Sequence, residues 1–203
     1  MEKIYFISSN NKKIEEIKKM FPSDIILLSL KDLNWQDEIA EDHETFVENA
    51  TQKVEVVLSK HSNNAFADDS GLEVEALNGA PGVYSARFAQ KNDSLMDNVD
   101  FLLQKLRNKT NRKAQFVCCI VLFWKGKYYS FEGKIKGQIS LEKKGDFGFA
   151  YDCVFVPDGY SQTFAEMNST QKNTISHRFI AINKMLDFLN QNQINIKNDD
   201  KDT

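Results

Sequence analysis

The chain has few cysteines, and they do not form a framework. Its 203 residues include three, Cys118, Cys119 and Cys153, and none has Cys-x-x-Cys spacing. An odd number without that spacing argues against a set of structural disulfides. We therefore expect a reducing compartment, the cytoplasm.

The chain also lacks long apolar runs and a strong charge imbalance. No run approaches the roughly 20 apolar residues that span a bilayer, and the N-terminal sequence MEKIYFISSNNKK has neither the apolar core nor the cleavage site of a signal peptide. A net charge of −3 implies no general attraction to nucleic acid or anionic membranes. We expect neither as a partner, so an anionic ligand would need local cations.

Several catalytic motifs are missing as well. The sequence has no Ser-His-Asp order, no zinc-ligand spacing and no G-x-G-x-x-G loop. It also lacks the D-x-D-x-T pattern of phosphatases that form an aspartyl phosphate, which disfavours that covalent intermediate.

Apolar periodicity nevertheless predicts a well-formed core. The pattern predicts strands at 4–8, 25–28, 65–69, 72–76, 115–124 and 128–135, and helices at 12–21, 44–60, 95–106 and 176–189. Mixed strands and helices of this kind, with a hairpin, indicate a single α/β or α+β domain with a mixed sheet. We place that domain at residues 1–190 and expect the polar segment 191–203 to be a disordered tail.

Two adjacent carboxylates, Asp68 and Asp69, follow an apolar run in the sequence FADDSG. Successive side chains of a strand point to opposite faces, so either the strand ends there or one aspartate faces a site and the other supports it. Oxygen ligands of this kind suit Mg²⁺, and Glu41 is a candidate second ligand. The alternatives are a solvated turn before Gly71 and a solvated acidic loop around Glu41.

Cations occur where an anion could meet them. The sequence SSNNKK at 8–13 joins a strand to a helix, whose free N–H groups and lysines attract phosphate; the alternative is an Asn-rich helix cap. Lys53 falls on the apolar stripe of its helix, so it either extends to solvent or meets an anion. His177 and Arg178 follow a capping Ser176, where cations oppose the helix dipole. An anion or a carbonyl-rich base edge would explain that pair, and a surface salt-bridge cluster is the alternative.

Together these stretches resemble the inosine triphosphate pyrophosphatase family. The similar segments are SSNNKKIEEI, TFVENATQKVE, FADDSGLEVEALNGAPGVYSARFA, DFGFAYDCVFVPDGYSQTFAEM and KNTISHRFIAI, which follow the family's order. The resemblance implies an α/β fold with a long, twisted mixed sheet, flanking helices and two lobes around a central nucleotide cleft. It further implies a homodimer that uses Mg²⁺ to hydrolyse ITP, dITP and XTP to the monophosphate and diphosphate.

The resemblance also implies roles for individual residues. Asp69 is the expected proton acceptor with Asp68 in support, and Glu41 and Asp69 are the expected metal ligands. The residues expected around the triphosphate are Ser8, Ser9, Asn10, Asn11, Lys12 and Lys13. Those expected at other parts of the nucleotide are Lys53, Ser70, Arg87 and Lys172, with Phe149, Ala150, Tyr151 and Asp152 along the base. Protonated His177 or Arg178 would donate hydrogen bonds to the purine 6-oxo group.

The chain departs from the family pattern at three positions. Ser8 stands where threonine is usual, Ala150 where glycine is frequent and Cys153 where proline is frequent. If position 150 has a positive φ, alanine would strain the loop by roughly 1 kcal/mol. The altered segment leaves two alternatives open: a pyrophosphatase for pyrimidine or other modified nucleotides, and a nucleotide-binding protein without activity.

Overall fold

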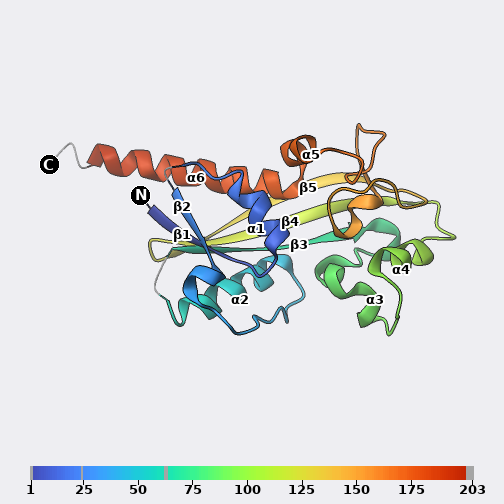
Figure 1. Ribbon diagram of the computed structural model, residues 1–203, viewed down its shortest axis with the longest axis horizontal. Helices are drawn as coiled ribbons and strands as arrows, with labels where there is room; N and C mark the ends of the chain where they lie inside the picture. The colour runs from blue at the N-terminus through green and yellow to red at the C-terminus, as the bar shows by residue number, and fades with distance from the viewer. Residues whose placement is uncertain (1, 24, 62–63, 200–203) are drawn as a thin grey trace.

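A computed structural model describes residues 2–23, 25–61 and 64–199, without the side chains of 193–199. Six strands form one mixed sheet in the order β2-β1-β3-β4-β5-β6 (Figure 1). The strands are β1 Glu2–Ile7, β2 Ile25–Ser29, β3 Ala65–Val74, β4 Lys113–Trp124, β5 Lys127–Ile139 and β6 Phe155–Pro157. The first three run parallel, and β3 to β6 pair antiparallel.

Helices cover both faces of the sheet (Figure 1). On one side lie α1 Asn11–Lys18, α5 Ser169–Ile175 and α6 His177–Asp199, and on the other α2 Phe46–Leu58, α3 Phe88–Lys91 and α4 Asn98–Lys105. Short 3-10 turns are η1 Leu30–Leu33, η2 Glu75–Leu77, η3 Gly82–Arg87 and η4 Ala150–Cys153. Since parallel strands cannot be joined by a tight hairpin, α1 and α2 provide the crossovers between β1, β2 and β3.

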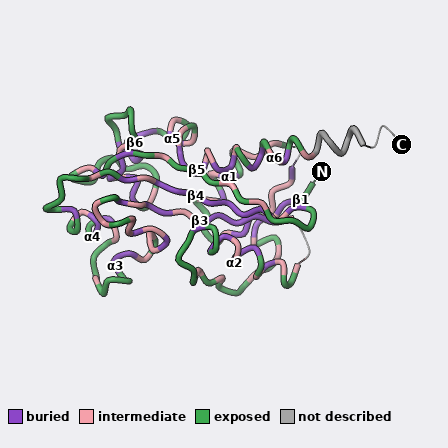
Figure 2. The backbone as a smooth tube through the Cα atoms, turned by 180° about the vertical axis from the view of Figure 1, so that it is seen from behind, coloured by how far each residue is buried: buried purple, intermediate pink, exposed green. Residues whose placement is uncertain are grey.

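The buried apolar side chains form clusters at both ends of the sheet. One packs α1 and α6 against the parallel strands, around Phe6, Ile17 and Ile182. Another, at the opposite end, includes Phe116 and Phe155. Figure 2 shows the buried residues along the central strands. Because β4 contributes to both clusters, this strand connects the two ends of the molecule.

The sequence predicted two short strands at 65–69 and 72–76, and this was wrong. β3 is a single strand from Ala65 to Val74, and its register with β4 is unbroken. Gly71 lies at the centre of that segment, where a Cβ would meet the backbone carbonyl of Gly82 and the ring of Phe46. The glycine therefore permits η3 to approach β3 rather than ending the strand.

The other predicted strands and the helices are present with shifted ends. The final helix is longer than predicted, since α6 continues past Leu189 to Asp199. The domain limits at 1–190 and 191–203 stay a prediction, and residues 200–203 lie outside the described part. Within the described residues, no helix combines the length and apolarity needed to cross a bilayer.

Candidate active site

A cavity of about 820 Å³ opens where the loop after β1, the segment before α2, the middle of β3, η4 and the start of α6 meet. All the predicted site residues line it except Lys12 and Asp68. These residues lie between Ser8 and Arg178 in the sequence, and the sheet brings them to one place. The structure therefore supports a shared site rather than separate solvated loops.

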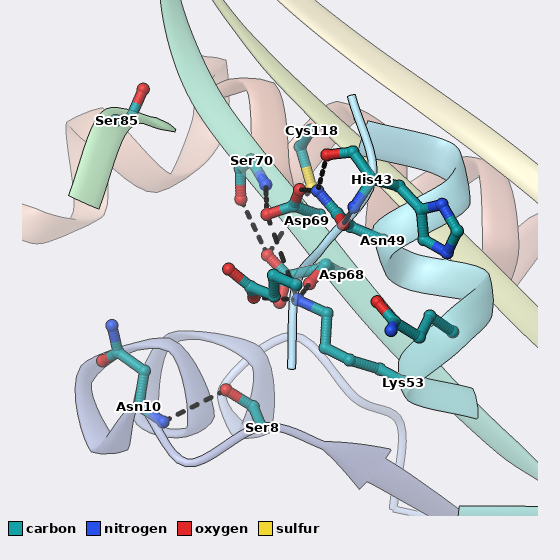
Figure 3. A network of polar contacts seen from close by, with 12 residues as sticks. Ser8, Asn10, His43, Asn49, Lys53, Asp68, Asp69, Ser70, Ser85 and Cys118 are labelled. Atoms are coloured by element: carbon teal, nitrogen blue, oxygen red, sulfur yellow. Dashed lines mark hydrogen bonds and ion pairs between the residues drawn. The ribbon is translucent and has the colours of Figure 1, made fainter. Parts of the chain in front are cut away.

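Asp69 faces the α2 side of this cavity. Its Oδ2 accepts a hydrogen bond from Asn49 Nδ2 at 3.1 Å, and Asn49 also bonds both backbone groups of His43 (Figure 3). Burial raises the pKa of the Asp69 carboxyl, and the neighbouring Glu41 raises it further, against the opposing effect of Lys53. Asp69 is thus a fixed carboxylate with an increased tendency to hold a proton.

Lys53 joins Asp69 to Glu41. Its Nζ donates to Glu41 Oε1 at 2.6 Å and to the backbone oxygen of Asp68 at 2.7 Å, and it lies 3.9 Å from Asp69 Oδ1 (Figure 3). Burial opposes the charge, but the surrounding carboxylates raise the pKa of Lys53, so it stays protonated. This lysine meets anions within the protein instead of extending to solvent.

Asp68 points to the opposite side of the sheet and does not line the cavity. Its Oδ2 lies 2.9 Å from Lys13 Nζ, 3.6 Å from Arg178 Nε and 2.8 Å from the Ser70 hydroxyl that donates to it. Burial alone would raise the pKa of Asp68, but Lys13 and Arg178 hold it well below its usual value. This permanently charged carboxylate is placed to position Lys13 and Arg178 rather than to touch a ligand.

The loop after β1 forms a helix cap. Asn10 Oδ1 accepts from the backbone N–H groups of Lys12 and Lys13, and Ser8 Oγ accepts from that of Asn10 (Figure 3). The same loop can cap the helix and bind phosphate, because the cap uses only the side-chain oxygen of Asn10 and its amide nitrogen can still donate to a phosphate. Lys12 was expected at the triphosphate but does not line the cavity. Its Nζ donates to Gly148 O at 3.5 Å.

Two further cations, Lys172 and Arg178, line the cavity. Lys172 Nζ lies 2.8 Å from Asp152 Oδ2, and Arg178 donates to Glu16 Oε2 at 2.6 Å. Glu16 also accepts from Lys172 at 3.3 Å. The ring of Phe149 lies over both cations, 5.0 Å from Lys172 Nζ and 5.8 Å from Arg178 Cζ. Sequence reasoning missed Glu16, although its place one helical turn after Lys13 puts both on the same face of α1.

The surroundings of His177 favour a neutral imidazole, whereas the sequence offered protonated His177 or Arg178 as the donor. Its ring stacks on Phe116 with centroids 4.7 Å apart and planes 9° apart. Burial, followed by the nearby charges of Arg178 and Lys172, lowers its pKa well below the usual value. A neutral imidazole has one N–H, so of the two donors expected for the 6-oxo group, Arg178 is the cationic one.

The segment beside the cavity contains a strained alanine. Ala150 has φ of +52°, in the left-handed region, so the backbone of this alanine is strained, as expected for a positive φ. The Asp152 carboxylate accepts from the backbone N–H of Phe149 at 2.8 Å and fixes the turn. Tyr151 is buried, with its hydroxyl donating to Ser85 O at 2.9 Å.

Arg87 holds the acidic segment before α2. It donates to the backbone oxygen of Glu41 at 2.8 Å and lies 3.7 Å from Glu41 Oε2. Since η3 carries Arg87 and α2 carries Lys53, Glu41 is held from two separate elements. Its carboxylate therefore has a defined position at the cavity wall.

The donor set suits magnesium that arrives with phosphate. Among the residues the structure describes, no group of three or more His, Cys, Asp or Glu side chains could hold a metal. Glu41 and Asp69 do face a common ammonium group. Mg²⁺ is usually held by one or two carboxylates together with waters and substrate phosphates, and this pair fits that requirement.

Comparisons with known proteins agree on one family. Residues 4–188 match the Ham1 family. The chain is 46% identical over 187 residues to a dITP/XTP pyrophosphatase of Flavobacterium johnsoniae, covering 92% of this chain and 97% of that protein. The solved Ham1 protein of Staphylococcus aureus is similar with a TM-score of 0.85 at 40% identity, covering 94% of this chain and 100% of that one. A HAM1 protein from Coxiella burnetii gives a TM-score of 0.85 at 32% identity, with the same coverage of both chains.

Proposed function

This chain belongs to the Ham1 family, and from that premise we propose that it is a dITP/XTP pyrophosphatase. It hydrolyses deaminated purine nucleoside triphosphates, ITP included, to the monophosphate and diphosphate, and so removes them from the nucleotide pool. The observation that carries the proposal is the convergence of Glu41, Asp69 and Lys53 in a cavity that Arg178 also lines.

Cations along the cavity wall would bind the polyphosphate. Lys13, Lys53 and Lys172 line the cavity. Asp68 holds Lys13, and Asp152 with Glu16 holds Lys172, so these charges need little rearrangement when phosphate arrives. Mg²⁺, held by Glu41 and Asp69, would polarise phosphate oxygens and neutralise charge as the bond to diphosphate breaks.

Asp69 is the residue placed to accept a proton from the attacking water. Asn49 fixes one carboxylate oxygen, while burial raises the carboxyl's pKa toward the working pH. A positioned general base contributes typically 10²–10⁴-fold to the rate. The water then attacks the α-phosphorus, and diphosphate leaves.

The base is selected by hydrogen-bond donors. Hypoxanthine and xanthine present an acceptor at position 6, whereas adenine presents an amino group. Arg178 is buried and always charged, and one of its amino groups donates to Ser70 Oγ at 3.3 Å. An arginine that donates to O6 would have no acceptor when adenine is bound. Sites built to hydrogen-bond one group discriminate against an analogue that lacks it by up to about 10⁴–10⁵-fold.

The finer architecture follows from the same premise. We place the nucleotide in a cleft between two lobes of the sheet and its helices, and we expect a cytoplasmic homodimer. Sedimentation of the full chain tests the dimer independently of activity.

A Mg²⁺-dependent nucleotide panel with product analysis tests the function. ITP, dITP and XTP should yield diphosphate, with little product from ATP. Equal turnover of ITP and ATP, or orthophosphate as the first product, would contradict the proposal. The strained Ala150 beside the base segment favours a second candidate, a pyrimidine or modified-nucleotide pyrophosphatase, and competition of dUTP against ITP separates the two.

A further inference from the structure

Lys53 lies where the two carboxylates of the site meet. Its side chain is 9% exposed, and its ammonium contacts Glu41 Oε1, Asp68 O and, more distantly, Asp69 Oδ1. A buried ammonium of this kind needs anionic partners, and here its partners include both carboxylates that fit a metal. Figure 3 shows the lysine stem running from α2 to Asp68 and Asp69.

The carboxylates would keep their positions if Lys53 moved away. Asn49 bonds Asp69, and Arg87 bonds the backbone of Glu41. The lysine itself has a flexible four-carbon stem that carries a compact charge. Both carboxylate residues therefore keep a contact from another side chain when the lysine moves away, with Arg87 3.7 Å from Glu41 Oε2, and Lys53 is the movable occupant of the pair.

We propose that Lys53 acts as an internal cation that occupies the Glu41–Asp69 pair in the free protein, so that a divalent metal enters with the nucleotide and not before it. Incoming phosphates give the ammonium a new anionic partner, which frees the carboxylates. With only two carboxylates and a resident positive charge, the free site attracts a second cation poorly. The nucleotide in this scheme rests on the proposed function, whereas the metal-binding step can be measured without it.

The test titrates the full-length protein with Mn²⁺ in the absence of nucleotide, with free Mn²⁺ followed by electron paramagnetic resonance. Wild type should bind weakly. Lys53→Met should bind at least about tenfold more tightly, because a repelling charge within a few ångströms of the metal has been removed. Adding Asp69→Asn to Lys53→Met should abolish the gain, which assigns the bound metal to this site.

Lys60→Met is the matched control. Lys60 follows α2 and pairs with Asp37 at 2.7 Å, so the substitution removes the same charge from the same region without touching the carboxylate pair. It should bind Mn²⁺ like wild type. Circular dichroism checks folding, and Lys53→Gln repeats the test if Lys53→Met unfolds.

Two results would overturn the proposal. One is a folded Lys53 variant that binds Mn²⁺ no more tightly than wild type. The other needs no variant: wild type binding Mn²⁺ alone with micromolar affinity. A tenfold gain in Lys53→Met, found together with a wild-type protein that fails to hydrolyse ITP, would support the inference and count against the proposed function alone.

Discussion

The carboxylates of Asp68 and Asp69 leave opposite faces of β3, although the two residues are adjacent. Asp68 meets Lys13 of α1 and Arg178 of α6, while Asp69 meets Asn49 and Lys53 of α2. One strand therefore supplies a structural counter-ion to one side and a candidate base to the other. The two positions should respond differently to the same chemical change.

Asp69→Asn should lower kcat for ITP by at least about 10²-fold, because the amide cannot accept the proton. The side-chain shape is kept, so the folded structure should persist. Initial rates of diphosphate release at saturating Mg²⁺ measure the effect. Asp37→Asn is the control, since Asp37 is an exposed carboxylate of the same cavity. Near-normal turnover by Asp69→Asn would remove this residue from catalysis.

Asp68→Asn should act mainly on stability. It leaves Lys13 and Arg178 without their buried counter-ion, and breaking a buried pair costs about 3–5 kcal/mol. Denaturant unfolding of wild type and variant measures this difference. If the free energy of unfolding is unchanged, the ion pairs of Asp68 do not stabilise the fold.

The same carboxylate predicts a pH dependence. The pKa of Asp68 is lower in the folded protein than its ordinary value of about 3.9. Its contribution to stability is therefore present above about pH 4 and is lost as pH falls below that value. Asp68→Asn should show a smaller loss of stability than wild type between about pH 4 and pH 3.

Ala150→Gly should stabilise the protein by about 0.5–1 kcal/mol. Glycine relieves the cost of a positive φ, about 1–2 kcal/mol, and loses part of that gain to its greater freedom in the unfolded chain. The midpoint of denaturant unfolding measures the change. Ala40→Gly is the control, because Ala40 is exposed and is not among the residues with positive φ. Destabilisation by Ala150→Gly would show that the loop is not strained there.

His177 predicts a second pH dependence at a higher pH. Its pKa in the folded protein lies well below the unfolded value of about 6.5. The unfolded chain therefore takes up the proton first, and stability falls as pH decreases through about 6.5. His177→Asn should flatten this slope between pH 7 and pH 5, while His43→Asn, at an exposed position, should leave it unchanged. An identical slope in His177→Asn and wild type would contradict a buried neutral imidazole.

Much of this arrangement could be predicted from the sequence, because the spacing of apolar residues along the chain indicates the strands and helices and the faces that are buried. Alternating apolar residues located most of the strands. The position of Lys53 on an apolar stripe left two possibilities, extension to solvent or an anionic partner, and the structure provides the partner in Glu41. The adjacent aspartates allowed two interpretations, an ended strand or one side chain facing the site with the other in support, and the unbroken β3 agrees with the second. These inferences depend on periodicity, which a single sequence contains.

Other features depend on contacts between distant segments and could not be read locally. The continuity of β3 through Gly71 reflects the approach of η3, which the strand sequence does not encode. The lowered pKa of His177 arises from burial, to which the stacked ring of Phe116 belongs, and from the neighbouring cations Arg178 and Lys172. Glu16 is linked to Arg178 across more than 160 residues. Each of these required the tertiary structure.

Hydrolysis of an equimolar mixture of dITP and dATP in H₂¹⁸O tests the central claim most directly. The account predicts that dITP is consumed at least about 10²-fold faster, with the heavy oxygen in dIMP and unlabelled diphosphate as the other product. Equal consumption of the two nucleotides, or heavy oxygen in released orthophosphate, would contradict it.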